Sequence, residues 1–245
     1  MVKQWLLVLF ICILAGGCTK EITPDPEELG LKYYPLHVGD YWIYQVTETR
    51  FQNQFENQAS DSVSYFVRER VDTVFKDLTN EDTYKIIRSR RNNSSEAWSS
   101  DSVYMVNKSG SDIRVSQNNV RVVKFIFPVL EGKKWNPNIF NSRSGVNDNQ
   151  DQTFYSFANP NAAFSLNGII YPKTVKVAQI LNENAIEKQN AFEIYAYGIG
   201  RIFKQAINYQ YCSDPDRQNG CEVGKQFIIT GIKRIEKLQE HGSLK

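Results

Sequence analysis

Short runs of β-forming residues, separated by clusters of turn-forming residues, recur along the chain from residue 41 onward. In one run, Val63, Tyr65 and Val67 occupy every second position. Such alternation is typical of half-buried strands, and its regular recurrence predicts antiparallel β structure. The runs that we expect as strands are 41–51, 62–75, 83–91, 97–107, 112–116, 120–127, 152–157, 169–181, 191–211 and 225–238.

These runs predict an all-β, mainly antiparallel fold of about ten strands with little helix. The sheet is expected to be a single curved sheet, a half-barrel or a sandwich, in one domain over residues 33–245. Residues 136–150, rich in Asn, Ser and Gly, form the longest expected loop. Residues 182–189 fit either two helical turns or a hairpin loop. The spacing of apolar residues in 232–240 predicts a short helix at the end of the last strand.

The composition supports strands and argues against nucleic-acid binding. Aromatic residues make up 13% of the chain, and 29 basic residues nearly balance 27 acidic ones. Aromatic and β-branched residues favour strands, and no basic stripe is present to bind nucleic acid. A chain of this size buries enough surface to fold without a metal.

The first 17 residues have the architecture of a secretory signal peptide. A basic start with Lys3 precedes an apolar run from Trp5 to Ala15, followed by two glycines and Cys18. The apolar run is shorter than the roughly 20 residues that a membrane-spanning helix needs. The order of segments therefore predicts export and removal of residues 1–17.

Residues 14–18, LAGGC, resemble the lipobox of bacterial lipoproteins. This resemblance implies cleavage before Cys18 and acylation of that cysteine, with the membrane as a partner through the lipid anchor. It places the protein in the cell envelope, on the outer membrane, and leaves open which face it occupies. Residues 18–32 contain Pro24 and Pro26 and few apolar groups, so we expect a flexible tether.

Three further segments resemble uncharacterised Bacteroidetes lipoproteins. They are a YYPL-x2-G-x-YW-x-Y opening over residues 33–44, a proline-glycine-tryptophan element over 127–135, and a Y-x-YGIG closing segment over 195–200. The resemblance implies a curved antiparallel sheet, similar to the half-barrels of lipoprotein carriers, and carries no known activity. Independently, Pro35 and Gly39 predict an entry turn.

Two cysteines, Cys212 and Cys221, bracket a short polar loop. In an oxidising compartment such a pair predicts a disulfide, and the alternative is two reduced, buried thiols. We expect the strands before and after this loop to pair as an antiparallel hairpin, because adjacent antiparallel strands join such runs most directly.

No catalytic, metal-binding or cofactor-binding residue is predicted, since the chain has two histidines and no recognised catalytic motif. Gly198 and Gly200 are expected to mark a bulge or bend inside a strand. The acidic residues that could serve glycoside hydrolysis in principle are expected to be solvated: Asp101, Glu131, Glu187 and Glu193.

The leading functional hypothesis is a non-enzymatic, membrane-anchored domain that binds or scaffolds an envelope protein or glycan. One alternative is a LolA-like half-barrel carrier of an acyl chain or another apolar ligand. A second alternative is a glycan-acting enzyme.

Overall fold

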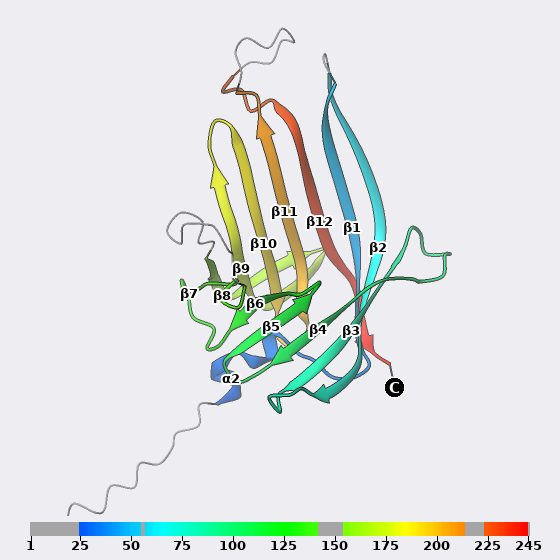
Figure 1. The fold of residues 1–245 in the computed structure, drawn as a ribbon, viewed down its shortest axis with the longest axis vertical. Coiled ribbons are helices and arrows are strands. Elements are labelled where there is room, and N and C mark those ends of the chain that lie inside the picture. Colours follow the sequence, from blue (N-terminus) through cyan, green and yellow to red (C-terminus); the bar gives the residue numbers. More distant parts are fainter. Residues whose placement is uncertain (1–24, 55–56, 142–153, 214–222, 245) are drawn as a thin grey trace, which may run out of the picture.

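The chain folds into one antiparallel sheet of 12 strands, which confirms the predicted fold class. The structure, a computed structural model, describes residues 25–54, 57–141, 154–213 and 223–244. The strand order is β6-β5-β4-β3-β2-β1-β12-β11-β10-β9-β8-β7, so the first and last parts of the chain meet at the β1–β12 pair in the middle of the sheet. Figure 1 shows the long strands standing side by side and curving around a common interior.

The strands are β1 (Asp40–Gln54), β2 (Asn57–Lys76), β3 (Asp82–Arg91), β4 (Ser99–Lys108), β5 (Asp112–Gln117), β6 (Val120–Ile126), β7 (Lys134–Trp135), β8 (Tyr155–Leu166), β9 (Ile169–Glu183), β10 (Glu187–Ala196), β11 (Gly200–Tyr211) and β12 (Ile228–Ser243). Nine of the ten expected runs correspond to single strands, because alternation of side chains across a sheet is a strong local signal.

The remaining run, 191–211, is two strands instead of one, so that prediction was wrong. Residues 197–199 form a tight turn between β10 and β11, with Gly198 at φ 77° and Gly200 at φ 97°. Glycine adopts this left-handed backbone without the steric cost that other residues meet. The two glycines therefore reverse the chain, and they do not mark a bulge inside one strand.

The helix predicted over residues 232–240 is also wrong, because β12 continues as a strand to Ser243. Pairing with β1 from Gly231 to Ser243 satisfies its backbone hydrogen bonds over the whole predicted helix, and this overrides the local spacing. Of the two alternatives for residues 182–189, the hairpin loop is correct: β9 ends at Glu183 and β10 begins at Glu187.

The prediction of a tether over residues 18–32 was wrong at its C-terminal end, where the chain is folded. A helical turn, α2 (Pro26–Leu29), and a 3-10 turn, η1 (Leu31–Tyr33), dock against the sheet. The amide of Val129 donates to the carbonyl of Leu29, and the amide of Gly198 donates to Lys32. These contacts add the segment to the domain and close one end of its interior.

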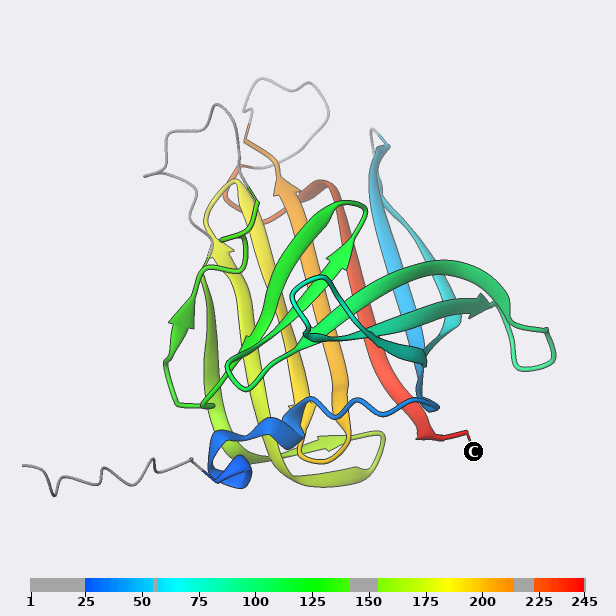
Figure 2. The same cartoon turned by 60° about the horizontal axis from the view of Figure 1, so that its bottom comes forward.

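The two ends of the curved sheet are joined by packed side chains and by a backbone hydrogen bond of 2.8 Å from the amide of Val123 to the carbonyl of Pro137. Figure 2 shows β4, β5 and β6 crossing the face of the long strands β10 and β11. Phe125 of β6 packs on Phe157 of β8 and Tyr195 of β10, with ring centroids 4.8 and 5.2 Å apart. The end strands β6 and β7 are not neighbours in the sheet, so this packing brings the two halves together.

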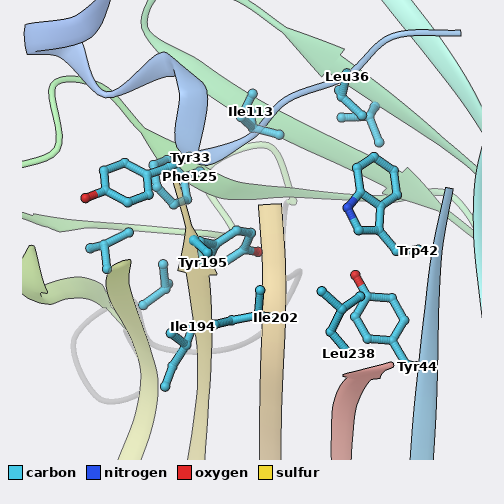
Figure 3. Close-up of a cluster of buried hydrophobic side chains, with 14 of the residues drawn as sticks. Tyr33, Leu36, Trp42, Tyr44, Ile113, Phe125, Ile194, Tyr195, Ile202 and Leu238 are labelled. Carbon is cyan, nitrogen blue, oxygen red and sulfur yellow. The ribbon is translucent and has the colours of Figure 1, made fainter. Parts of the chain in front are cut away.

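Figure 3 shows part of the core that results. Trp42 and Tyr44 both point inward from β1, as alternation along a strand requires, and both are buried. Tyr195 of β10 and Ile202 of β11 belong to the same buried cluster. The core therefore fills the end of the curved sheet that α2 and η1 cover.

Candidate functional site

A cavity of about 150 Å³ lies inside the curved sheet, next to this core. Aromatic side chains form part of its lining: Tyr34, Trp42, Tyr44, Tyr104 and Tyr195. Charged side chains form another part: Glu69, Arg88, Lys124, Glu193, Arg201 and Lys204. Charged residues are seldom found in a protein interior unless they are paired, so this lining marks the cavity as the candidate site.

The register of the sheet explains why these charges meet. Glu193 of β10 lies opposite Lys204 of β11, and Lys204 lies opposite Glu236 of β12. Residues directly opposite on neighbouring antiparallel strands point to the same face. A row of alternating charge thus crosses three strands on the inner face.

Arg201, the second residue of β11, has the most carboxylate partners in the described cluster. Its Nη2 donates to both carboxylate oxygens of Glu69, at 3.1 and 3.2 Å, and lies 3.1 Å from Oε2 of Glu236. The guanidinium also stacks over the ring of Tyr44, 4.5 Å from its centroid. Tyr44 in turn donates a hydrogen bond of 3.0 Å to the carbonyl of Arg201. These contacts fix the guanidinium against the cavity wall.

Glu193 is fully buried and is contacted by three cations. Its Oε1 lies 2.7 Å from Lys124, 3.7 Å from Lys204 and 3.8 Å from Arg201. The hydroxyl of Tyr195 donates to Oε2 at 2.7 Å. Burial opposes ionisation of this carboxyl, but the three positive charges outweigh burial and hold its pKa well below the usual range.

Glu236 responds to the same balance of forces. Burial raises its pKa, but the positive charges of Arg201, Lys204 and Arg234 have the larger effect and lower the pKa to about 2. Burial lowers the pKa of Lys204, and the charges of Glu193 and Glu236 partly restore it. At neutral pH the two glutamates are therefore ionised acceptors.

A second, charged hollow of about 470 Å³ adjoins the cavity, and Arg88 lines both. In this hollow Glu48 pairs with Arg50 at 2.6 Å and with Arg234 at 3.5 Å. Arg88 lies 3.2 Å from Asp101. Charged pairs thus continue from the cavity along the inner face.

The acidic residues considered from the sequence have different fates. Asp101 is exposed and lines the charged hollow, Glu131 is exposed, and Glu187 accepts a hydrogen bond from Asn182 in a hairpin. The expectation that Glu193 is solvated is wrong, because the inner face of β10 packs under β6.

Sequence reasoning also missed Glu69, Arg201, Lys204 and Glu236. A signal exists for Glu69: it lies between Val67 and Val71 at alternate positions of one strand, and all three are buried. A charged residue among inward-facing valines indicates a buried ionic partner.

Of the three cysteines predicted to be lipidated or disulfide-bonded, only Cys212 lies within the described residues. Cys18 and Cys221 lie outside the described residues. Cys212 is buried at the end of β11, and its amide donates to the carbonyl of Phe227 at 2.9 Å. The predicted pairing of the flanking strands is confirmed by β11 and β12, whereas the disulfide stays a prediction. Most of the expected loop 136–150 is also outside the described residues.

Comparisons with protein-family models, with curated proteins and with solved structures found no match to the chain. The resemblance to Bacteroidetes lipoproteins therefore stays a prediction. Within the described ranges, no group of His, Cys, Asp and Glu side chains is arranged to hold a metal ion. In those same ranges, no helix has the length and apolar character needed to cross a membrane.

Proposed function

We propose that this protein is a lipid-anchored, non-enzymatic binding protein of the cell envelope, and that the cavity inside its half-barrel holds the ligand. The observation that carries the proposal is a hollow lined by aromatic rings and ion-paired side chains in the middle of a packed interior. Buried ion pairs contribute little net stability compared with apolar packing. Their concentration around a hollow supports a role in recognition.

The charge states support binding over glycan hydrolysis. A glycosidase needs one carboxyl group with a raised pKa that can donate a proton to the leaving oxygen. Glu193 and Glu236 have lowered pKa values because cations surround them. These two carboxylates are suited to hold cations in place, and poorly suited to act as general acids.

The size and lining of the cavity also favour a small polar ligand over an acyl chain. A cavity of about 150 Å³ is comparable to one that holds benzene, and pockets for larger organic ligands span roughly 300–1,000 Å³. An acyl carrier needs a long apolar channel, whereas six charged side chains line this cavity.

The anchor is proposed from the lipobox resemblance and the position of α2. The segment 19–25 separates Cys18 from the first helical residue, Pro26. At about 3.3–3.6 Å per fully extended residue this segment spans at most roughly 25 Å. An acylated Cys18 would therefore hold the domain close to the membrane surface.

The binding role of the cavity can be tested by a substitution that fills it with a larger side chain. Val115 lines the cavity from β5, while Val120 of β6 is exposed. Val115→Phe and, as the matched control, Val120→Phe would each be isolated from the native membrane and extracted for mass spectrometry of small molecules. We expect one compound to accompany the unaltered protein and the control but not Val115→Phe. Equal recovery from all three proteins, or from none, would contradict the proposed function.

A further inference from the structure

Lys204 is the most weakly paired of the four cations that line the cavity. Arg201 contacts Glu69 at 3.1 Å, Arg88 contacts Asp101 at 3.2 Å, and Lys124 contacts Glu193 at 2.7 Å. The fourth cation, Lys204, has only Glu193 within ion-pair distance, at 3.7 Å.

The ammonium group of Lys204 also has unused hydrogen-bonding capacity. A lysine ammonium carries three donors, and Lys204 Nζ donates no hydrogen bond to any residue in the described part of the chain. The side chain is 29% exposed, so the group faces the cavity without being open to bulk water on all sides. An acceptor that enters the cavity would satisfy these donors, and a carboxylate would do so with charge-assisted hydrogen bonds.

The aromatic part of the cavity lining is suited to a flat or cyclic body. Trp42, Tyr44 and Tyr104 contribute rings to the lining, and two of these rings are held by hydrogen bonds. Trp42 Nε1 donates to the carbonyl of Ile199 at 2.6 Å, and the hydroxyl of Tyr44 donates to the carbonyl of Arg201. Held aromatic rings favour stacked or edge-on contacts with another ring.

We infer that the cavity binds a small cyclic monocarboxylate, with its carboxylate paired to Lys204 and its ring packed against the aromatic wall. This inference rests on the proposed binding function and adds the chemical class of the ligand. A carboxylate supplies acceptors for the unused donors of Lys204, and a single six-membered ring matches the cavity volume of about 150 Å³.

The test compares two probes that differ in charge and hardly in shape. Full-length protein in detergent would be titrated with 4-fluorobenzoate and with its uncharged analogue 4-fluorobenzamide, followed by fluorine-19 NMR. Pairing with an ammonium group should make the benzoate bind about tenfold more tightly or better. Lys204→Met should remove that preference, and Lys204→Arg should retain it because the charge remains.

A lysine on the neighbouring strand serves as the matched control. Lys237 of β12 is exposed and has no ion pair among the described residues, so Lys237→Met should keep the tenfold preference. Circular dichroism would show that each variant is folded before titration. Equal affinity of the unaltered protein for the two probes would overturn the carboxylate assignment while leaving a binding cavity. A preference that persists in folded Lys204→Met would overturn the role of Lys204. Binding of neither probe would overturn the ligand class, and the separate extraction experiment would still decide the proposed function.

Discussion

The carboxylate of Glu193 links both halves of the sheet. It belongs to β10, and its closest cation, Lys124, belongs to β6, which crosses over β10 from the other half. Arg201 and Lys204 approach the same oxygen from β11. Loss of this one negative charge would leave three neighbouring cations facing one another in a site of low dielectric.

We therefore predict that Glu193→Gln strongly destabilises the protein. Removing one partner of a buried ion pair costs about 3–5 kcal/mol, and Glu193 is completely buried. Glu183→Gln is the control, because Glu183 forms a more exposed ion pair with Lys188 at the end of β9. Urea denaturation should show a much lower free energy of unfolding for Glu193→Gln and little change for the control. Equal stability of the two variants would mean that Glu193 is not essential to the charged cluster.

At this scale the sequence predicts apolar residues better than charged ones. The inward positions of Trp42 and Tyr44 follow from alternation and are confirmed. Glu193 could not be distinguished from a solvated glutamate, because its partner Lys124 is 69 residues away in the chain. Only the closure of the sheet brings the two together.

The ionised glutamates on β10 and β12, the two strands that flank β11, make stability depend on pH. Glu193 of β10 and Glu236 of β12 have lower pKa values in the folded protein than the ordinary value of 4.5, which approximates the unfolded chain. The unfolded chain therefore binds more protons as the pH falls below about 5, and the free energy of unfolding decreases.

We expect the urea midpoint to decrease from pH 6 to pH 3, and to decrease less steeply in Glu236→Gln, because that variant lacks one of the two titrating groups. Denaturation curves at a series of pH values check both statements. Other carboxylates titrate in both proteins and cancel in the difference. A slope that is the same with and without Glu236 would contradict its lowered pKa.

The β11–β12 hairpin carries the predicted disulfide. The two strands pair up to Tyr211 and Ile228, which places Cys212 just beyond the last pair. We expect protein isolated without reductant to resist thiol labelling at Cys212 and Cys221. Reduction should lower the free energy of unfolding by about 2–3 kcal/mol in the chain-entropy model without abolishing the fold. Rapid labelling of both cysteines in denatured, unreduced protein would contradict the disulfide.

Element boundaries followed from the sequence where turns carried several turn-forming residues. The turn at 197–199 was missed because its signal is two glycines inside an otherwise continuous β-rich run. The end of β12 was assigned to a helix because local spacing does not reveal that β1 is present to pair with it. Both errors arise from long-range pairing, which a local pattern does not contain.

At the scale of the whole molecule, the sequence predicted mainly antiparallel β structure, as a single curved sheet, a half-barrel or a sandwich, but not how the sheet closes. The closure depends on β4–β6 folding across β10 and β11, with Phe125 and Lys124 as the contacting residues. α2 and η1 then cover one end, so that a segment expected as tether becomes part of the domain. The cavity exists only because these separate segments converge.

Native mass spectrometry of the intact protein, released from its own membrane in detergent, tests both the lipid anchor and the occupied cavity. We expect a chain that begins at Cys18, carries lipid on that cysteine, and holds one small molecule that is lost on denaturation. Cys18→Ser should lack the lipid mass and leave the membrane fraction. An unmodified N-terminus elsewhere in the chain would refute the anchor, and a native mass equal to the denatured mass would refute the bound ligand.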